Sequence, residues 1–423
     1  MPIAETVFSP FAGLSFEQKL DRLAAIAVRV GLGLRPGQEL YLTASTDALP
    51  LVRRLVEQAY KAGAKYVTTL LSDDALTLTR FRHAPDESFD YAPKWLYDGI
   101  ATAFSSGAAR LAVTGADPAL LAHEDPERIA RANTAQSRAY KPAMDLITRH
   151  EMNWSIVAAA TPAWAARVFP NDLPELALGK LWDAIFHTSR ITSDDPVGEW
   201  EQHGRNLKQR MDLLNAKRFH SLHFFTENGD TDLTVGLADG HLWAGGGTLA
   251  GNGILCQPNI PTEECFTTPH KDRVNGHVSA TKPLSHQGSL IENIRCTFAD
   301  GRIVEATATA GQDALRKLIS TDAGARQLGE VALVPHNSPI AQSGILFYNT
   351  LFDENAASHI ALGQAYSTCL IGGEKMSDEE LAAHGANDSL IHVDWMIGGP
   401  GVHVDGMHAN GTAEPLMRHG NWT

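Results

Sequence analysis

The chain has 423 residues, of which 43% are hydrophobic and 20% charged, a composition typical of a folded globular protein. Its formal net charge of −14 argues against binding to nucleic acid or to an anionic membrane surface, because both are themselves negative. The sequence shows neither a basic segment followed by an apolar run at its start nor a stretch of about 18 apolar residues. We therefore expect a cytoplasmic protein that contacts no membrane.

The first half of the chain alternates helical and strand patterns. Ser15 and Gln18 form a helix-entry signal, because a serine at this position can cap the first turn while the glutamine reaches back. Apolar runs bounded by turn residues then predict strands, with amphipathic segments between them. This alternation favours a mostly parallel sheet with helices on its faces. The predicted strands lie within 37–45, 65–74, 110–118 and 153–162, and a helix lies within 48–64.

The second half has a different pattern. Residues 219–237 and 296–309 each resemble two strands joined by a turn that contains glycine. A glycine-rich stretch at 245–253 has no Gly-Lys-Ser/Thr after it, so we interpret it as a tightly turning segment and not as a phosphate loop. The predicted fold class is α/β, with a mostly parallel N-terminal α/β domain at 1–212 and a β-rich α+β domain at 213–423 that would hold the metal site.

The four cysteines are scattered through the second half without a CxxC pair. This arrangement favours reduced thiols over a thiolate zinc site or a disulfide framework. The residues are Cys256, Cys265, Cys296 and Cys369.

Acids and histidines instead gather in four segments of the second half, beside apolar or turn residues. Charged groups in apolar surroundings cost several kcal/mol unless they are paired, hydrogen bonded or bound to metal. The four segments therefore require either ion pairs or a cation. They are 259–270, 329–334, 350–366 and 392–398.

His392 and Asp394 are two positions apart in an apolar run that predicts a strand. Residues at this spacing point to the same face, so both side chains can reach one ion while Val393 and Trp395 face the other way. In isolation, however, such a pair is more typical of a histidine that is hydrogen bonded to a neighbouring carboxylate.

The other segments leave similar alternatives open. Residues 350–366 resemble a helix, on which His359 and Tyr366 would lie two turns apart on one face, as pocket residues or as ordinary core residues. Glu354 does not align with them on that helix. Glu330 precedes the apolar run at 331–334 and is equally consistent with the end of a surface strand.

Glu263 and Glu264 are adjacent carboxylates that repel one another, so we expect only one of them to point into any site. Taken together, carboxylates, histidines and a tyrosine without sulfur suit zinc, cobalt or manganese. The excess of carboxylates favours two cations bridged by a carboxylate over one structural zinc. Two such ions activate water and polarise a carbonyl, so the pattern predicts a hydrolase.

Five blocks carry a more specific signal: NIPTEECFTTPH, TKPLSHQG, GEVALVPHNSPI, TLFDENAASHIALG and HVDWMIG. In this order they resemble the conserved blocks of the two-metal aminopeptidase T/aminopeptidase S family. The likeness extends into the first half, through LRPGQELYL and LWDAIF among others, and covers nearly the whole chain.

The resemblance implies an exopeptidase that releases N-terminal amino acids from peptides with a free N-terminus. It implies a homodimer and two divalent ions for each chain, which would be zinc, cobalt, manganese or magnesium. It also implies that Tyr366 lies at or near the metals. As a catalytic residue, Tyr366 could donate a hydrogen bond to the tetrahedral oxyanion or could fix a metal-bound water, and we assign Glu263 as a weak candidate for the general base. The implied metal ligands are Glu264, Glu330, Glu354, His359, His392 and Asp394, with Glu330 as the bridge.

Two alternatives remain at the level of the sequence. A two-metal site could hydrolyse another amide or an ester bond. The acids and histidines could instead form structural ion pairs in a peptide-binding scaffold without catalytic activity, in which case the chain would bind no divalent ion stoichiometrically.

Overall fold

The computed structural model describes residues 13–191, 194–286 and 289–423. The chain forms two compact units, one made of Met1–His203 and Gly247–Pro261, the other of Gly204–Gly246 and Thr262–Thr423. Helix α8 (Pro196–Lys217) contains the division between the units, after His203, and also residue 212, where the sequence predicted the end of the N-terminal domain. The predicted α/β class is confirmed, with a parallel sheet in the first unit and antiparallel sheets in the second.

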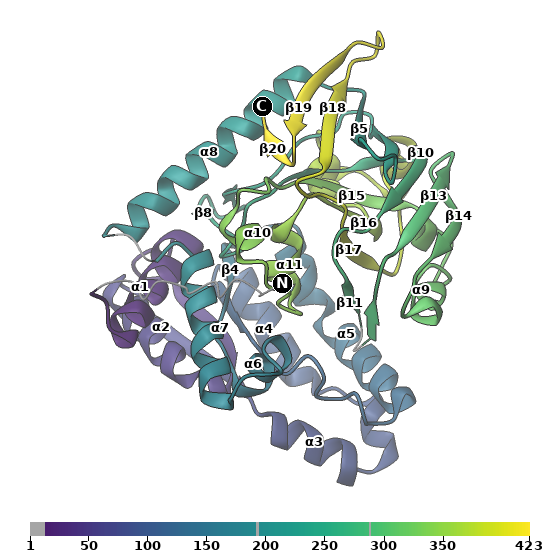
Figure 1. The fold of residues 1–423 in the computed structure, drawn as a ribbon. Helices are drawn as coiled ribbons and strands as arrows, with labels where there is room; N and C mark the ends of the chain where they lie inside the picture. The colour runs from purple at the N-terminus through teal and green to yellow at the C-terminus, as the bar shows by residue number, and fades with distance from the viewer. Residues whose placement is uncertain (1–12, 192–193, 287–288) are drawn as a thin grey trace. The chain divides into compact units, whose positions relative to one another are not determined.

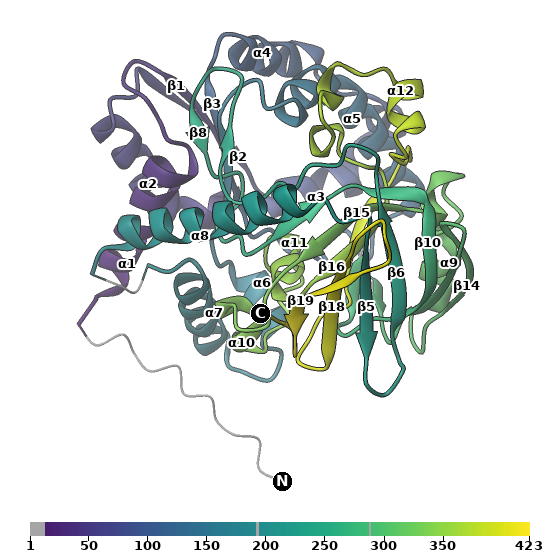
Figure 2. The ribbon, with the colours of Figure 1, turned by 90° about the horizontal axis from the view of Figure 1, so that it is seen from above.

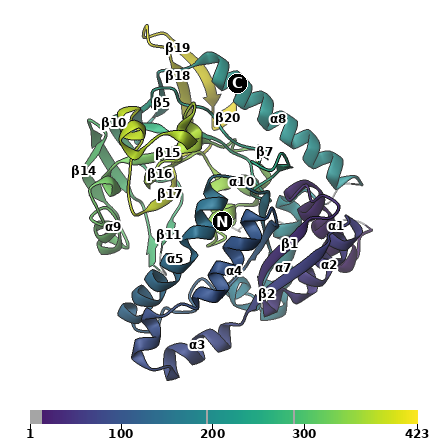
Figure 3. The same cartoon turned by 180° about the vertical axis from the view of Figure 1, so that it is seen from behind.

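The first unit is built on a four-stranded parallel sheet in the order β2-β1-β3-β4. Figure 3 shows helices α4 and α5 next to one another in this unit. Its strands are β1 (Glu39–Ser45), β2 (Tyr66–Ser72), β3 (Ala109–Thr114) and β4 (Trp154–Ala158), with the short pair β7 (Thr248–Leu249) and β8 (Leu255–Cys256). Its helices are α1 (Phe16–Ile26), α2 (Leu49–Lys61), α3 (Asp74–His83), α4 (Lys94–Ser105), α5 (Pro126–Thr148), α6 (Pro162–Val168) and α7 (Pro174–Thr188).

Local sequence signals explain where several of these elements begin and end. Ser15 and Gln18 form the capping box expected for α1. The four strands predicted in this half are all present. Strand β4 is not left open at its outer side, because Ile156 exchanges backbone hydrogen bonds with the returning segment 258–260. The downstream segment thus closes one edge of the parallel sheet.

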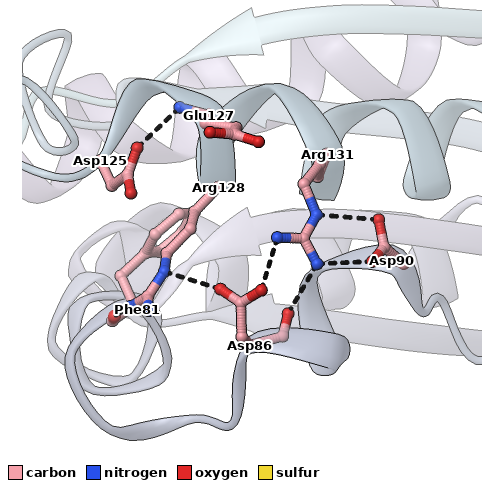
Figure 4. A network of polar contacts seen from close by, with 7 residues as sticks. All are labelled: Phe81, Asp86, Asp90, Asp125, Glu127, Arg128 and Arg131. Carbon is pink, nitrogen blue, oxygen red and sulfur yellow. Dashed lines mark hydrogen bonds and ion pairs between the residues drawn. The ribbon is translucent and has the colours of Figure 1, made fainter.

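A network of charges joins α5 to the short 3-10 helix Asp86–Asp90 (Figure 4). The guanidinium of Arg131 donates to the carboxylate of Asp86 at 2.7 Å and to both oxygens of Asp90 at 3.0 and 2.5 Å. Arg128 adds a hydrogen bond of 3.1 Å to Asp86. Exposed ion pairs contribute little one by one, but bidentate geometry shared among several charges favours a fixed position for this turn.

The second unit contains an eight-stranded sheet and a four-stranded sheet whose order is β17-β16-β15-β9. Strands β18, β5, β6 and β10 lie side by side in Figure 2, and Figure 1 shows β18 and β5 of the same sheet. The strands are β5 (Ser221–Thr226), β6 (Asp232–Leu237), β9 (Cys265–Thr267), β10 (Pro269–Ser279), β11 (Leu284–His286), β12 (Ser289–Ile291), β13 (Arg295–Ala299), β14 (Arg302–Thr307), β15 (Leu328–Leu333), β16 (His359–Gly363), β17 (His392–Met396), β18 (Val402–Met407), β19 (Ala413–Arg418) and β20 (Asn421–Trp422). Short helices connect them: α9 (Gln312–Leu318), α10 (Pro339–Ser343), α11 (Thr350–Asp353) and α12 (Asp378–Ala383).

Both predicted hairpins are present in this unit, as the pairs β5–β6 and β13–β14. One buried apolar cluster joins the two sheets, and it includes Phe224 of β5, Val331 of β15 and Trp395 of β17. The four-stranded sheet is therefore backed by the core on one face. Among the described residues, no helix is long and apolar enough to cross a membrane.

Candidate metal centre

The acids and histidines lie on the face of the four-stranded sheet that is turned away from Trp395. In the register of the strands, Glu330 of β15 pairs with Ala361 of β16, which pairs with Asp394 of β17. His359 lies two residues before Ala361, and His392 lies two residues before Asp394. Because residues at this spacing share a face, the pairing brings the four polar side chains together.

Two glycines allow the backbone to place these acids. Strand β15 has a bulge between Leu328 and Glu330, and a Cβ at Gly329 would lie 2.1 Å from the carbonyl oxygen of Gln364. A bulge changes the direction in which the next side chain points. A Cβ at Gly245 would likewise lie 2.3 Å from the carbonyl oxygen of Glu264. Only glycine permits such close backbone contacts beside the two glutamates.

The side chains form two groups that share Glu330. Glu264, Glu330 and His359 make one group, and Glu330, His392 and Asp394 make the other, with the ligand atoms of each group within 4.8 Å of one another. Nε2 of His359 lies 3.4 Å from Glu264 Oε2 and 3.4 Å from Glu330 Oε1, whereas Nε2 of His392 lies 3.7 Å from Glu330 Oε2. A tetrahedral ion with bonds of about 2.0–2.2 Å requires ligand atoms roughly 3.3–3.6 Å apart. The two His359 distances fall within this range and the His392 distance lies just above it, so both groups are close to the spacing that an ion needs.

Both imidazoles are held in the orientation that a metal ligand needs. Nδ1 of His359 lies 3.1 Å from the carbonyl oxygen of Ala357, and Nδ1 of His392 lies 2.7 Å from that of Gln364. A carbonyl only accepts, so each Nδ1 carries the proton and donates it. Nε2 of the neutral ring then has its lone pair directed at the carboxylates, as in metal-ligating histidines.

The electrostatics of the cluster show that it lacks positive charge. Burial raises the pKa of Glu264 to about 8, and the neighbouring carboxylates add to this effect. Burial lowers the pKa of His359, but Glu330, Glu264 and Asp394 outweigh it and raise that pKa to about 10. Burial also lowers the pKa of His392, but Asp394 and Glu330 outweigh it and raise that pKa to about 9. Bound protons therefore neutralise part of the negative charge of the site, which divalent cations in the same place would also neutralise.

Two further observations show that the residues fit metal ions. Oδ1 of Asp394 is buried and makes no hydrogen bond among the described residues; its contact with Nε2 of His392 is an ion pair at 3.5 Å. Between Glu330 and Asp394 stands Ala361, whose side chain is a single methyl group. A larger residue there would fill the space between the two carboxylates. The donor set, with carboxylate and imidazole and no thiolate, suits zinc, cobalt, manganese or magnesium.

The helix predicted for residues 350–366 is wrong. Thr350–Asp353 form helix α11 and Glu354–Ala356 a 3-10 turn, after which His359 begins strand β16. His359 and Tyr366 therefore do not stack on a helix. Tyr366 follows the strand and still reaches the cluster, because its ring centroid lies 4.8 Å from that of His392. Burial of its hydroxyl group first, and then the nearby carboxylates, hold the pKa of Tyr366 well above its usual value, although 41% of the residue is exposed.

Glu354 and Glu263 lie close to the cluster but outside the two groups of the described residues. Burial, reinforced by Glu264 and Asp394, holds the pKa of Glu354 well above its usual value. Glu354 and Asp394 also line the same small cavity of about 40 Å³. Glu263 is 3% exposed, and its backbone N–H donates to Oδ1 of Asn355 at 2.7 Å.

The residues that position the candidate ligands were not identified from the sequence. Ala361, Gly329 and Gly245 act by being small, while Ala357 and Gln364 act through their carbonyl groups. In the sequence, Gly329 is visible in the pair GE before the apolar run at 331–334, and Ala361 is visible in ALG shortly after His359. A backbone carbonyl is present in every residue, so the amino-acid sequence could not indicate that the carbonyl groups of Ala357 and Gln364 accept these hydrogen bonds.

Buried and half-buried carboxylates and imidazoles in two groups that share one glutamate are typical of metalloenzymes that use paired ions. The comparison with protein families agrees: the model of the thermophilic metalloprotease family (M29) matches residues 16–422. The chain belongs to this family.

Individual relatives match over almost their full length. Aminopeptidase T of Thermus thermophilus is 51% identical over 408 residues, which cover 96% of this chain and 99% of the relative. Aminopeptidase 2 of Geobacillus stearothermophilus is 45% identical over 407 residues, covering 96% and 98%. The solved structure of wild-type AmpT from Thermus thermophilus superimposes with a TM-score of 0.92 at 50% identity, covering 97% of this chain and all of that chain.

Proposed function

We propose that this metalloprotease is an aminopeptidase that releases N-terminal amino acids from peptides with a free N-terminus. The observation that carries the proposal is the sharing of Glu330 between two ligand groups, since a bridging carboxylate is how paired ions are held. The names of the relatives, aminopeptidase T and aminopeptidase 2, support the choice of an exopeptidase.

In this proposal one ion is held by Glu264, Glu330 and His359, and the other by Glu330, His392 and Asp394. Glu354 is a further candidate ligand, because it lines the same small cavity as Asp394. When bound, the ions supply an activated water and polarise the carbonyl of the first peptide bond. The ions are zinc, cobalt, manganese or magnesium, all of which suit carboxylate and imidazole ligands.

Two residues are proposed to act on the substrate. Tyr366 has a protonated hydroxyl group beside the cluster, so it can donate a hydrogen bond to the oxygen on which negative charge develops during hydrolysis. Glu263 is a weak candidate for the base that receives the proton of the attacking water and delivers it to the leaving amine. Its burial beside Glu264 supports proximity to the ions.

The proposal extends to the assembly and the compartment. We infer a homodimer from the family resemblance of the sequence. The four cysteines are buried free thiols, and this supports a reducing compartment such as the cytoplasm.

The proposal is tested by removing the metal with a chelator and adding back zinc, cobalt, manganese and magnesium separately. A set of short peptides with free or N-acetylated N-termini is then assayed for released amino acids. We expect activity to return with at least one ion, and only on free N-termini. Equal cleavage of acetylated peptides would contradict an aminopeptidase. Hydrolysis of esters or of other amides, without hydrolysis of peptides, would favour a different two-metal hydrolase.

A further inference from the structure

The second unit contains a cavity that is larger than the one beside Asp394. Its volume is about 500 Å³, which falls within the range of small-molecule sites, roughly 300–1,000 Å³. Its walls come from the turn between β5 and β6, the segment 279–282 and the connection between β17 and β18. None of the six candidate metal ligands is among the described residues that line it. The cavity is therefore distinct from the proposed metal centre.

One residue of this cavity is a half-buried cation without a counter-ion. The ammonium group of Lys282 forms no hydrogen bond or ion pair with the described residues. Burial lowers the pKa of Lys282, and the charge of Asp353 opposes this effect only in part. A carboxylate bound beside Lys282 would supply the negative charge that the protein does not provide there.

His403 adds an unused hydrogen-bond donor to the same cavity. Only 6% of the residue is exposed, and its Nδ1 atom accepts a hydrogen bond from the backbone N–H of His419 at 3.4 Å. The proton of the neutral ring is therefore on Nε2, which has no partner among the described residues. The rings of His403 and His419 lie 4.8 Å apart, and His419 and His336 also line the cavity. This wall can donate hydrogen bonds to an anionic group.

The turn between β5 and β6 contributes the opposite charge. Glu227 and Asp230 of this turn are exposed and line the cavity, and Glu227 forms no ion pair with the described residues. Their carboxylates repel phosphate and other purely anionic ligands. Lys282 and Glu227 thus line one cavity without pairing with each other. Two separate charges of opposite sign complement a ligand that carries both.

We propose that this cavity binds a small zwitterion, a free amino acid or a short peptide, with its carboxylate at Lys282 and His403 and its ammonium group at Glu227. The class of ligand follows from the charges of the cavity and not from the peptidase activity. The inference goes beyond the proposed function, because it gives the chain a second binding site. Amino acids are also the products of that function, so the ligand would be present wherever the enzyme acts.

The cavity adjoins the backbone that holds one of the candidate metal ligands. Ala357 lines the cavity, and its carbonyl oxygen lies 3.1 Å from Nδ1 of His359. Gly398 also lines the cavity, and its backbone N–H donates to the carbonyl oxygen of Ser358 at 2.7 Å. A bound zwitterion would therefore lie against both segments that fix the position of His359.

Binding to the metal-free protein, measured by isothermal titration calorimetry, tests the site without an ion that could hold the ligand elsewhere. Leucine and dileucine are compared with leucine amide, which lacks the carboxylate, and with N-acetyl-leucine, which lacks the ammonium group. We expect one zwitterion to bind per chain, and each analogue to bind about tenfold or more weakly, because a charge-assisted hydrogen bond is lost. The tighter of leucine and dileucine identifies the size of the ligand. No binding of either zwitterion, or equal binding of an analogue or of inorganic phosphate, would overturn the proposal.

Variants locate the bound zwitterion. Lys282→Met keeps the aliphatic stem and removes the charge, and Glu227→Gln removes the charge at the other end. Each should weaken binding of the zwitterion about tenfold or more. Lys317→Met, at an exposed position of α9 outside the cavity, is the matched control and should bind like the wild type. Circular dichroism checks folding, and Glu227→Gln keeps the test decisive if Lys282→Met does not fold, because Glu227 is exposed.

A further variant separates this cavity from the metal centre. Glu330→Gln removes a charge from the ligand cluster and should leave binding of the zwitterion to the metal-free protein unchanged. Wild-type binding by a folded Lys282→Met or Glu227→Gln variant, or loss of binding in Glu330→Gln, would overturn the proposal. The assay of restored peptidase activity is read separately, so failure of the second site and failure of the proposed function are distinguishable.

Discussion

Oε1 of Glu330 lies 3.4 Å from Nε2 of His359, and Oε2 of the same carboxylate lies 3.7 Å from Nε2 of His392. One side chain therefore belongs to both groups. Removing the charge of Glu330 affects both proposed ion sites, whereas removing any other ligand affects one directly. This asymmetry distinguishes a shared site from two independent ones.

In the first prediction, Glu330→Gln retains less than half of the divalent metal of the wild-type protein and loses peptidase activity. The amide has nearly the same shape, but one of its two former oxygens becomes a donor that cannot ligate a cation. Metal content is measured by elemental mass spectrometry after dialysis. Glu305→Gln, on the exposed strand β14, is the control and should keep both metal and activity. Two ions per chain with normal turnover in Glu330→Gln would refute the bridge.

A second prediction concerns Ala361, the residue between Glu330 and Asp394 in the strand register. Ala361→Val adds two methyl groups in a fully buried position and into the space that the ions would occupy. We expect metal content and activity to fall, and stability to fall by about 1–3 kcal/mol from overpacking. Ala361→Ser, which is smaller, should retain more metal. Full metal content in the valine variant would show that the ions lie elsewhere.

The sequence predicted the site best where side-chain spacing alone sets direction. His392 and Asp394 share a face because of the two-residue period of a strand. This part of the prediction does not depend on which strands lie next to β17. Trp395 was expected on the opposite face, and it packs there in the core. Ser15 and Gln18 likewise act within one turn of helix.

The prediction failed where distant strands determine the local structure. Residues 359–363 contain alanine, leucine and isoleucine in a pattern that local preferences allow as helix. They form a strand because β15 and β17 pair with them on either side, and all five are buried. For the same reason, the return of residues 247–261 to the first unit left no local signal.

A third prediction separates Tyr366 from the metal ligands. In Tyr366→Phe the ring and its contact with His392 remain, and only the hydroxyl group is lost. We expect kcat to fall by about 10- to 1,000-fold, the range for loss of one hydrogen bond to a developing negative charge. KM and metal content should change little. An unchanged kcat would remove the tyrosine from the mechanism, and loss of metal would make it a ligand or a support for one.

The fourth prediction concerns pH and uses a histidine of the first unit. Burial lowers the pKa of His150, whose Nδ1 atom is buried without a hydrogen-bond partner among the described residues. The unfolded chain therefore binds a proton more readily than the folded one. The stabilising contribution is complete above the unfolded pKa of about 6.5 and is lost as the pH falls through that value towards the lower folded pKa.

We therefore expect His150→Asn to reduce the loss of stability between about pH 7.5 and about pH 5.5, by up to about 1.4 kcal/mol for each pH unit below the unfolded pKa. Asparagine is chosen because His150 has a φ of 50°, which asparagine tolerates better than most residues. Urea unfolding of metal-free protein at both pH values measures the effect without interference from metal release. His123→Asn, at an exposed position, is the control and should follow the wild type. The same pH dependence in all three proteins would mean that His150 is not the group that titrates.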